Sequence, residues 1–243
     1  MRKITVLEKI YRNHREAKAS LAEILGDLMD LDVRIISISR STREWATVSL
    51  EGPDEEVAER YLESVIGRVT SLDGIEEGDV RKGRVVDLGK VGYGIYVDVG
   101  VVGESDGPVD ALIPIFSLKK HLGIRGPASI NRISQRLGVI DYLPMDVRIF
   151  KVDRKRGEIE GRLTNSQARR LGRGRNRIYI VGETRRKIKN AIQRSGNSGH
   201  VVRVKRLGLL ENEVQCSKDV DPHEIVRAIG PIINASMSVP MGL

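Results

Sequence analysis

The chain has 243 residues, enough for one large domain or for two or three small ones. Apolar residues make up 40% and charged residues 30%, so buried cores are possible, whereas aromatic residues make up only 4%. No apolar run approaches the roughly 20 residues of a membrane span, and the N-terminal residues lack the apolar stretch of a signal peptide. The one cysteine, Cys216, has no partner for an internal disulfide. We therefore expect a soluble, cytoplasmic protein.

The net charge of +8 is distributed unevenly along the chain. Residues 1–74 carry 11 Lys and Arg against 14 Asp and Glu, and residues 75–167 carry 15 against 13. Residues 168–243 carry 15 against 6, so the excess positive charge lies in the last third. This asymmetry favours an anionic partner for that end of the chain, although a solvated basic face would give the same pattern.

Residues 1–74 predict a small βαββα unit. The expected elements are a strand at 2–11, a helix from Asn13, a hairpin of 33–40 and 44–51, and a helix from Pro53. Asn13 with Glu16 three positions later forms a capping box, and the proline and acids after Gly52 suit a helix start. The second helix is expected to bury one face, made of Val57, Tyr61, Leu62 and Val65.

Residues 168–243 repeat that order of elements after a basic arm. The expected elements are a strand at 177–182, a helix capped by Thr184, a hairpin of 200–207 and 211–217, and a helix opened by Asp221 and Pro222. We infer either an ancient duplication or two convergent units.

The central residues 75–167 switch to short strands punctuated by glycine. Five strands are expected, at 80–86, 92–99, 111–115, 147–152 and 158–163. A longer insertion at 118–140 separates the third strand from the fourth and contains a helix near 128–137. Five short strands with turns between them are typical of a small closed barrel, so the chain belongs to the α+β class, with a central barrel between two βαββα units.

The central strands carry motifs in a characteristic order. These are Gly78-Asp79-Val80, Gly83-Arg84-Val85, Tyr93-Gly94-Ile95-Tyr96-Val97-Asp98-Val99-Gly100, Asp110-Ala111-Leu112-Ile113, Asp141-Tyr142-Leu143 and Val152-Asp153. Over about 85 residues the chain thus resembles the ribosomal S-one-type RNA-binding domain, a five-stranded OB-fold barrel. As a whole, it also resembles an uncharacterised archaeal family with the same three-part layout.

The resemblance implies an RNA-binding face on the second strand. The two aromatic residues of that face correspond to Tyr93 and Tyr96, and Lys90 lies in the turn before them, where it could meet a phosphate. Two positions depart from the family pattern, because Pro114 stands where many relatives have histidine and Glu158 where a basic residue is usual. The alternative is that both tyrosines belong to the core, or to an interface of a barrel retained for protein contacts.

Three basic segments outside the barrel strands are further candidates for phosphate contact. They are Lys119 and Lys120 in the insertion, the arginines Arg169, Arg170, Arg173, Arg175 and Arg177, and the helix start Arg185-Arg186-Lys187. The arginine-rich segment is expected to be a flexible arm that orders on nucleic acid. Three cations at a helix start are unfavourable unless an anion is bound, although side chains extending into solvent would reduce that cost.

The sequence shows no pattern of catalysis or metal binding. The histidines are scattered, and no nucleophile has a base nearby in sequence. Asp98, Asp106 and Asp110 could meet near one rim of the barrel, but we expect solvated acids there rather than a metal site. We therefore expect no cofactor, no metal and no enzymatic activity.

The sequence is compatible with two candidate functions. The first is a non-catalytic protein that binds structured or single-stranded RNA, for example on the ribosome, through the barrel and the basic C-terminal third. The second is a protein-assembly factor that docks on a translation or transcription complex. The sequence does not determine the oligomeric state.

Overall fold

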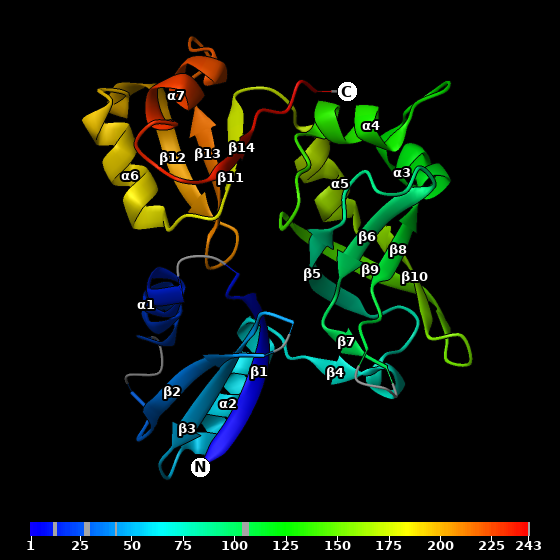
Figure 1. Cartoon of the computed structure of the whole chain (residues 1–243), viewed down its shortest axis with the longest axis vertical. Coiled ribbons are helices and arrows are strands. Elements are labelled where there is room, and N and C mark those ends of the chain that lie inside the picture. Colours follow the sequence, from blue (N-terminus) through cyan, green and yellow to red (C-terminus); the bar gives the residue numbers. More distant parts are fainter. Residues whose placement is uncertain (12–13, 27–29, 42, 104–106, 243) are drawn as a thin grey trace.

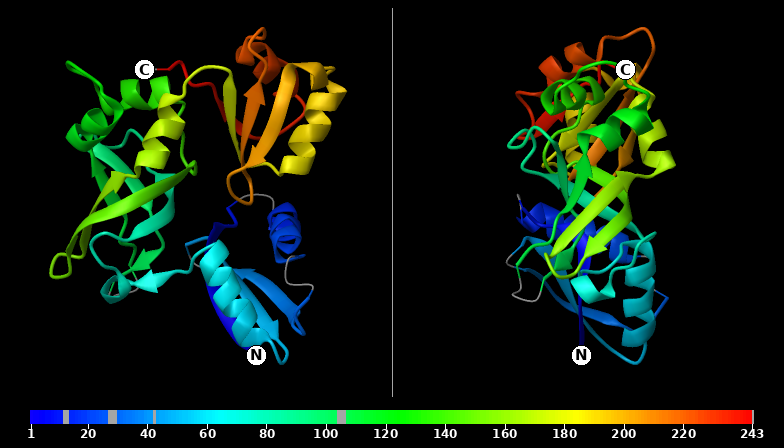
Figure 2. Two further views of the ribbon diagram at one scale, coloured as in Figure 1. Left: turned by 180° about the vertical axis from the view of Figure 1, so that it is seen from behind. Right: turned by 90° about the vertical axis from the view of Figure 1, so that its right-hand side faces the viewer.

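The computed structural model describes the chain except for residues 12–13, 27–29, 42, 104–106 and 243. It has a mixed α+β fold with a closed five-stranded barrel at its centre. The barrel lies beside two smaller α/β units, which follow one another along the long axis of the molecule (Figures 1 and 2). The expected α+β class with a central barrel is therefore confirmed.

The N-terminal unit is a three-stranded sheet with two helices. Its elements are β1 (Arg2–Lys9), α1 (His14–Leu25), β2 (Arg34–Arg40), β3 (Trp45–Glu51) and α2 (Glu55–Val65). The strand order is β1-β3-β2, and both pairs are antiparallel. The expected N-cap Asn13 lies outside the described residues. On α2, Ala58 and Leu62 are buried while Val57 and Val65 are more than half exposed, so the buried face is displaced around the helix from the expected one.

The central barrel closes in the order β10-β8-β6-β5-β9. Its strands are β5 (Val80–Val86), β6 (Gly94–Asp98), β8 (Ala111–Pro114), β9 (Pro144–Asp153) and β10 (Glu158–Leu163). Strands β10 and β8 are parallel and the other neighbours are antiparallel. Alternate side chains such as Val97, Ile113 and Val147 fill the interior, while the residues between them face outward. A short parallel pair, β4 (Thr70–Ser71) and β7 (Val101–Val102), lies where the barrel meets the N-terminal unit (Figure 1).

Three helices cover one end of the barrel: α3 (Ile115–Leu122), α4 (Ile130–Leu137) and α5 (Asn165–Gly172) (Figure 1). The expected helix in the insertion is α4, where the Ser129 side chain accepts a hydrogen bond from the Arg132 backbone N–H. Helix α3 was not expected from the sequence. The flexible arm predicted over the first arginines is wrong, because Thr164 caps α5 and Leu171 buries its apolar face in the barrel core.

The C-terminal unit is a four-stranded sheet with two helices on one face. Its elements are β11 (Arg177–Val181), α6 (Arg185–Arg194), β12 (Val201–Arg206), β13 (Glu211–Cys216), α7 (Pro222–Ile229) and β14 (Ser236–Ser238). Thr184 and Asp221 cap the two helices as expected, each accepting a hydrogen bond from a backbone N–H in the first turn. The strand order β12-β13-β11-β14 places the second hairpin strand in the middle, as β1-β3-β2 does in the N-terminal unit.

The three units meet around a buried ion cluster. Arg84 of the barrel is fully buried, and its guanidinium lies 2.5 Å from a carboxylate oxygen of Glu8 and 3.4 Å from one of Glu211. Next to it, Leu209 and Leu210 from the β12–β13 turn pack into the core of the N-terminal unit. An added Cβ at Gly208 would collide with the Glu211 carboxylate and the Arg84 guanidinium, so a side chain there would displace the cluster. The cluster and the leucine contact hold the three units in a fixed arrangement.

Candidate nucleic-acid interface

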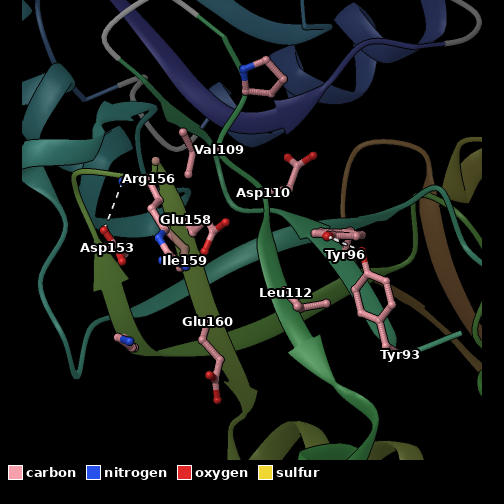
Figure 3. A pocket seen from close by; sticks show the side chains of 13 residues that line it. Tyr93, Tyr96, Val109, Asp110, Leu112, Asp153, Arg156, Glu158, Ile159 and Glu160 are labelled. Atoms are coloured by element: carbon pink, nitrogen blue, oxygen red, sulfur yellow. Dashed lines mark hydrogen bonds between the residues drawn. The ribbon is translucent and has the colours of Figure 1, made fainter. Parts of the chain in front are cut away.

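Tyr93 and Tyr96 stand at the edge of a groove on the outer surface of the barrel (Figure 3). Tyr96 lies on β6 and Tyr93 immediately before it, and their hydroxyl oxygens are 3.0 Å apart. Their rings meet edge to face, with centroids 6.3 Å apart and an interplanar angle of 82°. The side chain of Tyr93 is 54% exposed. The tyrosine pair is therefore accessible to a ligand. It is not part of the core, which was one of the two places that the alternative interpretation gave it.

The register of the barrel strands places four side chains at the floor of the groove. Tyr96 on β6 pairs with Leu112 on β8, Leu112 pairs with Glu160 on β10, and Glu160 pairs with Lys151 on β9. These four residues form one row of outward side chains across four neighbouring strands. The space above them has a volume of about 530 Å³. Such a space could admit a nucleobase or a peptide side chain.

The groove is predominantly acidic. Its lining includes the four carboxylates of Asp110, Asp153, Glu158 and Glu160, against the two cations Lys151 and Arg156. Figure 3 shows Asp110 and Glu158 on either side of the open space, with Tyr96 next to it. A phosphate placed among these carboxylates would be repelled. If the groove binds a nucleotide, its lining suits the base rather than the backbone.

Two groups of the groove have shifted pKa values. The hydrogen bond with Tyr93, together with partial burial, raises the pKa of Tyr96 to about 12. Burial and the nearby charge of Asp98 raise the pKa of Asp110, although Arg43 of the N-terminal unit donates a hydrogen bond of 3.0 Å to its Oδ1 atom. The N-terminal unit thus contributes a side chain to one end of the groove.

Two further exposed aromatic residues lie on the barrel and were not singled out from the sequence. Phe116, in the first turn of α3, is 63% exposed, and Phe150 on β9 is 44% exposed. The guanidinium of Arg162 stacks over the Phe150 ring at 3.1 Å from its centroid. Helix α3 packs against β6, β8 and β10, and the Ile115 N–H donates to the carbonyl of Tyr93. In the sequence, Phe150 stands between Arg148 and Lys151, which could have indicated an exposed ring, whereas Phe116 lies in the mainly apolar stretch 112–118 and gave no such signal.

The lysines predicted to contact phosphate differ in their surroundings. Lys90 is exposed in the turn before β6 and forms a 2.6 Å ion pair with Asp87. Lys119 and Lys120 lie in the last turn of α3, where cations also complement the helix dipole. Helix α3 packs against α5, so the two lysines lie on the end of the barrel that also carries Arg169 and Arg173 (Figure 1).

The arginine-rich segment divides into structural and free side chains. Arg170 donates to the carbonyl of Pro144 at 2.7 Å, Arg175 donates to the carbonyl of Met241, and Arg177 pairs with Glu213 at 3.3 Å. Among the described residues of this segment, Arg169 and Arg173 are exposed and have neither an ion pair nor a side-chain hydrogen bond.

The basic start of α6 already has anionic neighbours. The buried Glu183 carboxylate accepts the N–H of Thr184, and the ammonium of Lys187 lies 3.7 Å from Glu183 and 3.4 Å from Glu16 of α1. Lys187 thus has carboxylates of the chain itself as neighbours, and its contact with a phosphate stays a prediction. Arg185 and Arg186 remain exposed and, among the residues that the structure describes, have no ion pair.

Metal ligands and membrane-spanning helices are two further features of the described residues. No three His, Cys, Asp or Glu side chains in the described ranges are grouped closely enough to hold a metal ion. Asp98 is buried against Lys9 at 2.6 Å, and Asp106 lies outside the described residues. None of the described helices has the length and apolar character that a bilayer crossing requires.

Three domain models of one family together match nearly the whole chain. The DUF2110 N-terminal, central and C-terminal domains match residues 3–72, 75–173 and 175–240. The chain belongs to the DUF2110 family. None of the three descriptions names an OB fold or an RNA-binding domain.

The comparisons with curated proteins and solved structures give no further assignment. No curated protein matches the chain. Similar solved structures include an uncharacterized protein from Methanocaldococcus jannaschii, which is 17% identical. The match covers 37% of this chain and 93% of that one, with a TM-score of 0.24.

Proposed function

We propose that this DUF2110 protein binds RNA without catalysing a reaction on it, and that its central barrel is an OB-fold domain of the ribosomal S-one type. The observation that carries the proposal is the exposed tyrosine pair beside the barrel groove. Aromatic rings at the surface of a small barrel are the usual platform for single-stranded nucleic acid, since every base can stack on them. Ribosomal RNA or another structured or single-stranded RNA is the proposed partner, in the cytoplasm.

The charges are arranged so that bases and phosphates would be bound at different places. The groove holds the acidic residues, while exposed cations lie on α3 and α5 or at their ends, where these helices cover one end of the same barrel. A strand whose base enters the groove would carry its phosphates outward, toward cations such as Lys119, Lys120, Arg169 and Arg173. This division supports binding of single-stranded RNA, because in a duplex the base edges are paired.

Binding of the full-length protein to a fluorescent single-stranded RNA of 12 nucleotides tests the proposal. Each base–aromatic stack is worth about 1–3 kcal/mol, so Tyr93→Ala and Tyr96→Ala together should weaken binding by at least about tenfold. Val57→Ala, at an exposed apolar side chain of the N-terminal unit, is the matched control and should leave binding unchanged. Absence of RNA binding by the unaltered protein would refute the proposal.

The second candidate function is assembly with a protein of a translation or transcription complex. The carboxylates of the groove favour it, because basic peptide segments would pair with them. Under this alternative, the double tyrosine variant would leave RNA binding unchanged and lose a protein partner in co-purification.

A further inference from the structure

The groove next to the tyrosines combines a stacking surface with hydrogen-bond acceptors. A carboxylate has two oxygens that accept hydrogen bonds and none that donates. Such a group repels a phosphate but suits a base edge that presents N–H groups. The acidic character that argues against backbone binding therefore argues for base selection.

Among the described residues, Glu158 and Glu160 are the carboxylates of the groove that have neither an ion pair nor a side-chain hydrogen bond, and Glu158 is the one of the two whose charge reaches Tyr96. Glu158 is exposed and lies at the start of β10 opposite Asp153. Its charge contributes to the raised pKa of Tyr96, which places the two groups within electrostatic reach. In Figure 3 the carboxylate of Glu158 points into the open space beside Tyr96.

Two of the other carboxylates of the groove already accept hydrogen bonds. Arg43 donates to Oδ1 of Asp110, and the Asp153 carboxylate accepts the backbone N–H of Arg156. Glu160 lies two positions further along β10, opposite the cation Lys151 in the sheet register. A base stacked on Tyr96 would thus direct its edge toward Glu158 first, with Asp110 on the other side of the space (Figure 3).

We propose that the groove selects the base bound there, with Glu158 accepting hydrogen bonds from its Watson–Crick edge, so that guanine is preferred and uracil is disfavoured. Guanine presents two adjacent donors, N1–H and N2–H₂, which match the two oxygens of one carboxylate. Adenine and cytosine each present one amino group. Uracil presents a single N–H between two carbonyl oxygens, which the carboxylate would repel. This inference rests on the proposed RNA-binding function and adds a specificity-determining residue to it.

Three RNAs of 12 nucleotides, measured with the full-length protein at one salt concentration, test the inference. They are a uridine-only strand, an alternating guanosine–uridine strand, and the same strand with inosine in place of guanosine. A good bidentate pair is worth about 1–3 kcal/mol of discrimination. The guanosine strand should therefore bind about 5- to 150-fold more tightly than the uridine strand, and inosine, which lacks the N2 amino group, should lie between them.

Glu158→Gln should abolish most of this preference, chiefly by improving binding of the uridine strand. Glu224→Gln, at an exposed position on α7, removes the same charge elsewhere and should leave the ratio of affinities unchanged. Because Glu158 is exposed, its replacement should not affect folding, which a thermal melt would verify. Equal binding of all three RNAs, or an unchanged ratio in Glu158→Gln, would overturn the inference while the RNA-binding function stands. Binding of none of them would overturn both.

Discussion

At the scale of single residues, the hydroxyl pair of Tyr93 and Tyr96 sets the properties of the stacking surface. The hydrogen bond stabilises the neutral phenol of Tyr96 and, together with partial burial, raises its pKa from 10 to about 12. Between these two values the folded protein keeps a proton that the unfolded chain loses, so the free energy of unfolding falls as pH rises through this window. Tyr96 thus remains uncharged over the whole physiological range.

Replacing Tyr93 by phenylalanine should lower the pKa of Tyr96 toward 10, because the hydroxyl that hydrogen-bonds with Tyr96 is removed while the ring remains. The measurement is an NMR titration of protein labelled with ¹³C at the tyrosine Cζ, with the Tyr96 signal assigned from Tyr96→Phe. The buried Tyr179, whose pKa burial raises independently, is an internal control that should not move. A Tyr96 signal that still titrates near 12 would contradict the role of this hydrogen bond.

At the scale of elements, local chemistry predicted most helices and strands correctly. Thr184 and Asp221 were identified as caps because their side chains act within one turn of the chain. Helix α3 was missed because its N-cap position is Pro114, the last residue of β8, which has no side chain that could cap a helix. The sequence of α5 was interpreted as a flexible arm because of its arginines. Its apolar residues Ala168 and Leu171, which pack on the barrel, were not recognised as a helix face.

The candidate site was less predictable than the fold. Tyr93 and Tyr96 could be found because they lie three positions apart at the start of one strand, whereas Phe116 and Phe150 belong to elements whose proximity depends on barrel closure. The lining of the acidic groove includes residues of β8, β9 and β10, and the sequence did not indicate that Asp110 and Glu158 lie in the same groove. Contacts of this kind depend on packing between segments that are distant in sequence.

Helix α5 supplies a second prediction, on the salt dependence of RNA binding. Arg169 and Arg173 are its exposed cations, so Arg169→Ser with Arg173→Ser should reduce the slope of log affinity against log salt by about 0.7 for each phosphate that is no longer neutralised. The double variant Lys3→Ser and Arg60→Ser, on exposed cations of the acidic N-terminal unit, removes equal charge and should keep the slope. Equal slopes for both variants and the unaltered protein would exclude α5 from the interface.

At the scale of the whole molecule, Arg84 links all three units. One carboxylate comes from β1 and the other from β13, which are separated from Arg84 by 76 and 127 positions in the sequence. No local pattern could reveal such a cluster. A fully buried guanidinium needs both hydrogen bonds and opposite charge to offset the loss of water, so the arrangement of the units depends on this contact.

The two carboxylates of the cluster have opposite pKa shifts. Burial alone would raise the pKa of Glu8, but the charges of Arg84 and Lys82 outweigh it and hold this pKa below the ordinary value of 4.5. Burial raises the pKa of Glu211, and the charge of Glu8 adds to that effect. Glu8 therefore stabilises the fold above its unfolded pKa, and this contribution is lost as pH falls through its folded pKa. Glu211 has the opposite sign, and its ionisation weakens the fold as pH rises.

The two glutamates should consequently respond differently to replacement by glutamine. Glu8→Gln removes the closer partner of a buried charge and should lower the free energy of unfolding at neutral pH by about 3–5 kcal/mol. Glu211→Gln removes a carboxylate that burial already disfavours and should cost clearly less. Urea denaturation at neutral pH and at pH 4 measures both, with Glu224→Gln as the exposed control. The loss of stability on acidification should also be smaller in Glu8→Gln than in the unaltered protein, because the variant no longer carries the carboxylate whose protonation costs stability. Equal destabilisation by both replacements would show that Arg84 does not depend on Glu8 more than on Glu211.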